Sequence, residues 1–386
     1  MSGRLQIRPV HSKGELDAFI KLPFRLYAGE SRWVPPLIAE RRRFLDRRRN
    51  PFFEHARAEY FLAWRDGRPV GRITAQVDDN FQAFQQNAWG FFGFFESEDD
   101  PEVAAALLRA AREWLEREGC DHMVGPCDFT TNDPCGILIE GFERIPLILQ
   151  PWTPRHYPAL LEGAGLVKAM DLYMWEIHIS DREKVHPAIF AAADSIEAAG
   201  IRVRNMRKDD LEAEVARFID VYHAAWEDNW GFVPLTESEV RHYVDEIRPV
   251  LSEDWAWLAE KDGEVVGAAV TLPDYNQVLK HLNGRLLPFG WIRALYWRRR
   301  ISRVRQFALG VKPEFQKSGI AARLYTVHFE AAEKTGIHLA ELGWILETNP
   351  INHALEGLNG RIVRRYRMYE TPLGAPAGVE SASAPG

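Results

Sequence analysis

The residues with the clearest chemical potential lie between positions 305 and 336. A short apolar run at 307–311 is followed by a Lys-Pro-Glu-Phe turn and then by the sequence QKSGIA at 316–321. From position 320 onward, apolar residues recur at 324, 327 and 331, which places them on one face of a helix. Gly336 is the expected end of that helix. The stretch therefore predicts a strand, a loop and a helix in that order.

The small residues at the start of the predicted helix suit an anionic ligand. Gly319 and Ala321 leave room for a ligand to approach the backbone closely. The first N–H groups of a helix are unpaired and lie at its positive end. Lys317 and Arg323 add positive charge. We expect this loop to hold a pyrophosphate, although the chain contains neither GxxxxGK[ST] nor GxGxxG.

The loop resembles the acyl-CoA loop of the GCN5-related N-acetyltransferase (GNAT) superfamily. That family carries Gln/Arg-x-x-Gly-x-Gly/Ala between its fourth strand and third helix, and Gln316, Gly319 and Ala321 match the pattern. An ordinary strand-to-helix turn is the alternative explanation. The resemblance implies an acyl-CoA as co-substrate, with acetyl-CoA as the favoured donor, and no metal.

The resemblance also implies where the rest of the cofactor lies. In this family the pantetheine pairs with the main chain of the fourth strand, and the thioester sits where the fourth and fifth strands separate. The residues implied in acyl-CoA binding are Ala308, Leu309, Val311, Gln316, Lys317, Ser318, Gly319, Ile320, Ala321 and Asn349. Asn349 has an equal alternative role as the cap of a helix that begins near position 351.

Transfer of an acyl group to an amine needs a base for the ammonium and a hydrogen-bond donor for the thioester oxygen. Glu347, at the end of the predicted fifth strand, is the first candidate base and Glu341 is the second. Each could equally be a surface carboxylate or a capping partner. The resemblance implies the N–H of Val311 as the donor to the oxygen.

The leaving thiolate also needs a proton. Many GNAT enzymes supply it from a tyrosine early in the helix after the fifth strand, but the matching position in this chain is Glu356. We name Tyr366 as the substitute, with Tyr325 and Tyr369 as alternatives.

Length and composition place the chain among globular proteins with more than one domain. It has 386 residues, of which 46% are apolar and 27% charged, and its net charge is −7. A negative net charge argues against a general nucleic-acid binder. Three cysteines at irregular spacing fit neither a disulfide framework nor a zinc site. Without a visible signal peptide or membrane-spanning run, we expect a cytoplasmic protein.

The chain repeats one plan twice. LAWRDGRPVGRITA at 62–75 matches LAEKDGEVVGAAVT at 258–271, and both predict two strands joined by an Asp-Gly turn. Each copy, near 190 residues long, is similar to the whole GNAT fold. We therefore predict an α/β (α+β) fold of two tandem GNAT-like domains, each a mixed, mainly antiparallel twisted sheet flanked by helices. The expected units are a degenerate domain at 1–180, a linking helix at 181–200, a domain with the acyl-CoA loop at 201–370 and a disordered tail at 371–386.

The two copies differ at the loop that would hold the pyrophosphate. In the first copy the equivalent sequence is ESEDDPE at 96–102, which has no glycine and five carboxylates. These would repel a pyrophosphate. Asp99 or Asp100 suits a helix N-cap, with Pro101 at the first helical position. We expect the first copy to support the fold or to form a wall of the acceptor pocket at the junction of the copies, with 89–95 and 286–297 as candidate walls.

Two further segments carry unusual charge or apolarity. The run RRRFLDRRR at 41–49 predicts a solvated helix face, with a phosphate or lipid-headgroup contact as the alternative. The segment LLPFGWIRALYWRRR at 286–300 lies between the third and fourth strands of the second copy. A helix packed between the two domains is the preferred interpretation. Contact with a membrane surface or a long acyl chain is the alternative.

These features predict an acyl-CoA-dependent N-acyltransferase that acts on a small-molecule or peptide amine by direct transfer with general-base assistance. One alternative is a CoA-independent aminoacyl or peptidyl transferase similar to the Fem group, against which the intact loop counts. Another is a non-catalytic acyl-CoA-binding protein, which Glu356 in place of a tyrosine leaves open. The expected partners are acyl-CoA and an amine, and the expected state is a monomer or homodimer.

Overall fold

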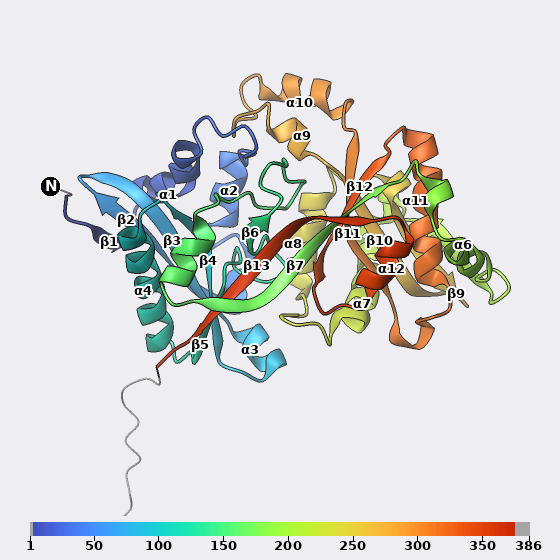
Figure 1. Ribbon diagram of the computed structural model, residues 1–386, viewed down its shortest axis with the longest axis horizontal. Helices are drawn as coiled ribbons and strands as arrows, with labels where there is room; N and C mark the ends of the chain where they lie inside the picture. The colour runs from blue at the N-terminus through green and yellow to red at the C-terminus, as the bar shows by residue number, and fades with distance from the viewer. Residues whose placement is uncertain (1–2, 375–386) are drawn as a thin grey trace, which may run out of the picture.

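The computed structural model describes residues 3–374. All of its strands belong to one 13-stranded sheet, in the order β1-β2-β3-β4-β5-β13-β7-β12-β11-β10-β9-β8, with β6 paired to β13 off this path. Figure 1 shows the first half of the chain, in blue and green, beside the second half, in yellow to red. The mixed, mainly antiparallel sheet with flanking helices confirms the predicted fold class.

The first half contains the elements β1 (Gln6–Pro9), α1 (Lys13–Leu26), α2 (Ile38–Phe44), η1 (Pro51–Glu54), β2 (Ala56–Arg65), β3 (Arg68–Asp78), α3 (Asp79–Gln85), β4 (Trp89–Ser97), α4 (Pro101–Arg117), β5 (His122–Gly125), β6 (Ile137–Glu140), α5 (Tyr157–Gly163) and β7 (Val167–His178). The connecting segment contains η2 (Arg182–Lys184) and α6 (Pro187–Asp194).

The second half contains β8 (Ile201–Asn205), η3 (Lys208–Asp210), α7 (Leu211–Trp226), α8 (Glu237–Ile247), η4 (Glu253–Trp255), β9 (Ala256–Lys261), β10 (Glu264–Pro273), α9 (Asn276–Leu279), α10 (Gly290–Arg298), β11 (Arg303–Val311), η5 (Pro313–Phe315), α11 (Ile320–Thr335), β12 (Leu339–Leu346), α12 (Ile351–Gly357) and β13 (Arg361–Pro372). Because β13 extends to Pro372, ordered structure continues past residue 370. The rest of the predicted tail, 375–386, lies outside the described residues.

The last strands of the two halves are exchanged. β7 ends the first half but pairs with β12, where Leu339 faces His178. β13 ends the second half but pairs with β5, where Tyr369 faces Gly125. The two exchanged strands also pair with each other, and Figure 1 shows them crossing side by side at the centre of the molecule. A fragment that began at residue 201 would therefore lack β7, a strand of its own sheet. The division at 181–200 stays a prediction.

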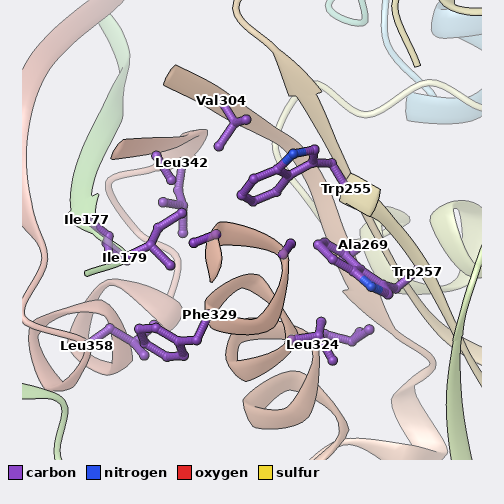
Figure 2. Close-up of a cluster of buried hydrophobic side chains, with 14 of the residues drawn as sticks. Ile177, Ile179, Trp255, Trp257, Ala269, Val304, Leu324, Phe329, Leu342 and Leu358 are labelled. Carbon is purple, nitrogen blue, oxygen red and sulfur yellow. The ribbon is translucent and has the colours of Figure 1, made fainter. Parts of the chain in front are cut away.

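Helix α11 is the centre of the second-half core. Its predicted apolar face is buried, with Ile320 and Leu324 at 1% and 0% exposure. That face packs against the sheet beside Trp255 and Trp257 (Figure 2). Gly336 ends the helix with a φ of 71°, a left-handed conformation that favours glycine. The packing fixes the start of α11, and thus the loop before it, relative to β11.

Candidate functional site

Strands β11 and β12 separate halfway along their length. They pair in parallel only from Arg303 opposite Leu339 to Gln306 opposite Leu342. Both continue beyond that point, β11 to Val311 and β12 to Leu346. Within residues 3–374, the part of β11 after Gln306 has no strand partner on its β12 side. We call the space between these strand ends the second-half gap. It has the strand separation expected of the thioester site.

The register of β11 against β10 decides which backbone groups face this gap. Lys312 N–H donates to the Val266 carbonyl at 2.9 Å, and Val311 lies opposite Gly267. Along a strand of an antiparallel pair, the main-chain groups of successive residues point alternately toward the partner strand and away from it. Since Lys312 is bonded to β10, the main-chain groups of Val311 and Leu309 point away from β10. The main chain of Ala308 is instead bonded to β10. The backbone of Leu309 and Val311, rather than that of Ala308, is available to a pantetheine.

The predicted pyrophosphate loop precedes α11 as expected. Gln316 and Lys317 are exposed, and Ile320 is buried, so only its backbone could reach a ligand. No side chain of the described residues caps the start of α11 in the usual N-cap geometry. The Ser318 hydroxyl makes a long contact of 3.4 Å with the N–H of Ile320. The loop thus presents backbone N–H groups and a lysine at a helix N-terminus.

Gly319 has a second constraint besides its φ of 91°. A Cβ at this position would lie 2.2 Å from the carbonyl oxygen of Ala192, just beyond the middle of α6. The linking helix therefore packs directly against the loop. Any side chain at position 319 would disturb this contact whether or not a ligand is bound.

Glu341 lies in a buried ion pair. Its carboxylate accepts from the Arg364 guanidinium at 2.6 and 3.1 Å, and both side chains are 1% exposed. Burial raises the pKa of Glu341, and the charge of Arg364 opposes that rise. Arg364 also donates to Gln150 and to the carbonyl of Ile145 in the first half. With both oxygens bound to one guanidinium, Glu341 is better suited to hold Arg364 than to accept a proton.

Glu347 directly follows the end of β12 at Leu346. Its carboxylate accepts from Lys168 Nζ at 2.7 Å and from the N–H of Asp171 at 3.1 Å. Its side chain is 23% exposed. Of the two predicted bases it is the one that solvent can reach, and both of its printed contacts, Lys168 and Asp171, lie on β7, on the side of β12 away from β11. Asn349 accepts from the N–H of Ile351 at 3.0 Å, which is the capping role considered for it.

Two of the three tyrosines named as proton donors have their hydroxyls bonded to the protein. Tyr366 is fully buried and donates to the carbonyl of Pro151 at 3.0 Å, and burial raises its pKa to about 12. Tyr369 donates to Glu162 at 3.1 Å. Tyr325 lines a small cavity between α11 and the strands of the gap, and burial raises its pKa. Glu356, at the position of the usual tyrosine, is exposed on α12.

Arg305 is a residue of this site that the sequence did not single out. Its guanidinium lies where β11 and β12 begin to separate, and it donates to the Gly343 carbonyl at 3.0 and 3.2 Å. It also donates to the Ile148 carbonyl of the first half at 2.7 Å and lies 4.7 Å from the ring centroid of Trp344. Burial lowers its pKa to about 10. The sequence signal that could have identified Arg305 was a charged residue within a predicted buried strand, RVRQFALG at 303–310.

The equivalent gap in the first half is filled by the protein. Strands β4 and β5 pair only as far as Phe91 opposite Val124, although β4 continues to Ser97. Cys127 N–H donates to the Phe92 carbonyl at 2.9 Å, and the Asp128 carboxylate accepts from the Phe94 N–H at 3.3 Å. A Cβ at Gly93 would lie 1.9 Å from the Cys127 carbonyl oxygen. The chain itself occupies the space that a pantetheine would need.

The acidic loop of the first half serves the fold. Asp100 caps α4 by accepting from the N–H groups of Glu102 and Val103, as predicted, and it also pairs with Arg65. The side chain of Glu96 is 13% exposed and accepts from Tyr157 at 2.8 Å. The aromatic run at 89–95 is mostly buried in the first-half core, so it does not form the open wall of a pocket.

No group of three His, Cys, Asp or Glu side chains in residues 3–374 could hold a metal ion. None of the helices in these residues combines the length and apolarity needed to cross a bilayer.

Comparison with known proteins identifies the fold and the family. The model of the Acetyltransferase (GNAT) family matches residues 216–355. The bacterial ceramide synthase of Caulobacter vibrioides (strain NA1000 / CB15N) is 36% identical over 381 residues, which cover 96% of this chain and 98% of that protein. Protein YghO of Escherichia coli (strain K12) is 35% identical, with 95% of each chain covered.

Solved structures agree on the architecture. A tandem GNAT protein from the clavulanic acid biosynthesis pathway superposes with a TM-score of 0.57 at 12% identity, covering 96% of this chain and 99% of that one. A GCN5-related N-acetyltransferase from Sphaerobacter thermophilus gives a TM-score of 0.53 at 12% identity, with 95% of each chain covered. At such identity these likenesses show the fold alone. Together with the relatives, they show that the chain belongs to the GNAT superfamily of N-acyltransferases in its tandem, two-domain form.

Proposed function

We propose that this protein transfers a fatty acyl group from acyl-CoA, bound in the second half, to the amine of a long-chain amino alcohol. The observation that carries the proposal is the contrast between the two gaps. The second-half gap keeps the loop at 316–321 and free backbone at Leu309 and Val311. The first-half gap is occupied by Cys127 and Asp128.

The proposed substrates come from the near full-length relative named as a bacterial ceramide synthase. A ceramide is a long-chain amino alcohol whose nitrogen carries a fatty acyl group. An enzyme that makes one must join a fatty acyl donor to a lipid amine. This extends the expectation from sequence, which named acetyl-CoA and a small-molecule or peptide amine.

The proposed reaction is direct. The amine nitrogen attacks the thioester carbon, the C–N bond forms and the C–S bond breaks. The nitrogen then loses its remaining extra proton, which leaves with the CoA thiolate as the free thiol. The N–H of Val311 or Leu309 would stabilise the negative charge that develops on the thioester oxygen. Glu347 would take the proton from the ammonium, directly or through a water. Arg305 and Glu341 are positioning residues, because each acts through another group of the gap.

The test is an acyl-transfer assay with the full chain. Acetyl-, octanoyl- and palmitoyl-CoA are each offered with a long-chain amino alcohol or with a short primary amine. Released CoA thiol and the product amide, identified by mass, are measured together. We expect the amide to form from the long-chain donor and the long-chain amine. Acetylation of the short amine, without acylation of the lipid amine, would overturn the proposed substrates while leaving an acyl-CoA enzyme.

A further inference from the structure

The segment between β10 and β11 carries most of the exposed large apolar side chains of residues 3–374. Helix α10 has no buried residue, so the interpretation of a helix packed between the two domains is wrong. Leu287 and Phe289, in the turn before α10, are 76% and 72% exposed. Trp291, Ile292 and Leu295 on the helix are each about half exposed. Figure 1 shows α9 and α10 at the top edge of the molecule.

The apolar residues share one face of this segment. Ala294 and Trp297 face inward, and Trp297 stacks on His281 with ring centroids 3.7 Å apart. Trp291, Ile292 and Leu295 follow a helical spacing of i, i+1 and i+4, which places them on the opposite face. We call this face, with Leu287 and Phe289, the apolar face of the hairpin 275–302. Apolar patches of this kind on a protein surface mark interaction sites.

The charge of the hairpin is of one sign. Residues 275–302 contain six cations and no carboxylate, in a chain whose net charge is −7; the cations are Lys280, Arg285, Arg293, Arg298, Arg299 and Arg300. Within residues 3–374, none of them has a carboxylate within 4.0 Å. Arg300 instead lies over the ring of Tyr296, 3.6 Å from its centroid.

The other arginine-rich segment is different in this respect. Five of the six arginines at 41–49 contact carboxylates, for example Arg42 with Asp17 at 2.6 Å and Arg47 with Glu59 at 3.1 Å. Their charge is neutralised within the protein, and only the first part of the predicted helix face forms, because α2 ends at Phe44. The cations of the hairpin are neutralised by nothing in the described chain. Charge complementarity therefore points to a partner that is anionic and apolar at once.

We propose that the hairpin 275–302 docks on the surface of a bilayer that contains anionic lipids. Leu287, Phe289 and Trp291 would enter the boundary between headgroups and acyl chains, and the arginines would contact lipid phosphates. Tryptophan and arginine at such a boundary each keep a polar end in the headgroup layer.

The position of the hairpin suits this orientation. The N–H of Ile148 donates to Asp274 at 3.0 Å, and Asn276 donates to the Pro146 carbonyl at 2.9 Å. The base of the hairpin is thus bonded to the first-half segment 146–148. Arg305 is bonded to the same segment, at the point where β11 and β12 begin to separate. β11 leads from the hairpin to the acyl-CoA loop, and its 9 residues span roughly 30 Å. With the hairpin docked, the acyl-CoA loop would lie at the far end of β11, away from the lipid, and the point where β11 and β12 separate would lie nearer to it.

Docking is tested by vesicle flotation of the full chain, without acyl-CoA, so the result does not depend on acyl transfer. We expect binding to vesicles of equal phosphatidylcholine and phosphatidylglycerol, weak binding to phosphatidylcholine alone, and loss of binding at high salt. Arg298→Gln with Arg299→Gln should weaken binding about 30-fold, since each arginine near an anionic surface contributes roughly fivefold, or about 1 kcal/mol. The matched control, Arg48→Gln with Arg49→Gln, should bind as the unaltered chain does.

A second pair of variants tests the apolar part. Leu287→Ser with Phe289→Ser should abolish flotation, whereas Val167→Ser, which alters an apolar residue of 57% exposure elsewhere, should not. All variants change exposed side chains, so their melting temperatures should stay unchanged. Equal flotation of the hairpin variants and the unaltered chain would overturn the proposal. So would a dimer in light scattering that Leu287→Ser with Phe289→Ser splits while no variant floats, because the occupant would then be a second copy.

Discussion

The two strand gaps show how one fold can leave a strand edge free in one half and fill the space beside it in the other. In both halves a parallel strand pair separates after a few residues. In the second half the separated edge is left free and ends at a loop with a glycine, a lysine and uncapped N–H groups. In the first half, Cys127 and Asp128 bond to the separated edge, and the loop carries carboxylates that cap α4. Hydrogen bonds to the backbone of the separated strand, one from a main-chain N–H and one to a carboxylate, distinguish the two gaps.

The largest expected effect comes from the carboxylate at the end of the second-half gap. Glu347→Gln should lower kcat by roughly 10²–10⁴ with little change in acyl-CoA affinity, because the amine loses its base. The matched change in the first-half gap is Asp128→Asn. It removes a carboxylate whose pKa burial raises to about 6, and kcat should stay within about twofold. Rates are measured at saturating acyl-CoA, and equal loss in both variants would contradict the assignment of chemistry to one half.

Replacing Arg305 should lower the free energy of unfolding. Arg305→Met would leave the carbonyls of Gly343 and Ile148 without their buried donor. Each unsatisfied group costs about 1–3 kcal/mol, so we expect a loss of about 3 kcal/mol in unfolding free energy. Chemical denaturation measures this loss. A variant as stable as the unaltered chain would show that Arg305 does not hold the gap together.

His55 joins the two halves through charge. Its ring nitrogens lie 3.0 Å from Asp78 in the first half and 3.2 Å from Glu239 in the second. Burial opposes the charge on His55, but the two carboxylates outweigh it and raise its pKa to about 10. Because the pKa of His55 is raised in the fold, its protonation stabilises the fold. This stabilisation is fully present at pH values below the ordinary pKa near 6.5 and is lost as the pH rises toward 10.

His55→Gln should therefore cost about 2 kcal/mol at pH 6 and much less at pH 10. Denaturation at several pH values measures the difference. A cost that does not change between pH 6 and pH 10 would show that the charge of His55 does not stabilise the junction.

A smaller effect is expected from giving the second loop the acidic character of the first. Lys317→Glu should weaken CoA binding about tenfold, because a carboxylate then faces the phosphates. Position 317 is preferable to 319, where a side chain would clash with α6. Lys334→Glu reverses an exposed lysine at the other end of α11 and should leave affinity unchanged. Calorimetric titration with CoA compares the two, and an equal affinity for both variants would remove the loop from the site.

Features set by neighbouring residues could be predicted from the sequence. The apolar face of α11, the cap at Asp100 and the two Asp-Gly hairpins depend on spacing within a few positions. Helix α8 was missed although its capping box, Thr236 with Glu239, stands in the sequence. The exchange of β7 and β13 could not be predicted, because either strand could pair with β5 or β12 on local pattern alone.

Burial was equally hard to predict. Arg305 is a charged residue that is buried, and the hairpin 275–302 is an apolar segment that is exposed to solvent. Both reverse the usual relation between residue type and exposure. The filling of the first-half gap by Cys127 and Asp128 depends on a backbone path that no residue type encodes. These exceptions lie at the two strand gaps and on the hairpin 275–302.

The central claim is that one half binds acyl-CoA and the other cannot. Hydrogen exchange of the full chain with and without CoA, joined to a calorimetric count of sites, tests it most directly. The account predicts one CoA per chain, with slowed exchange in residues 307–323 and no change in 92–102. Two CoA molecules per chain, or slowed exchange in 92–102, would contradict it.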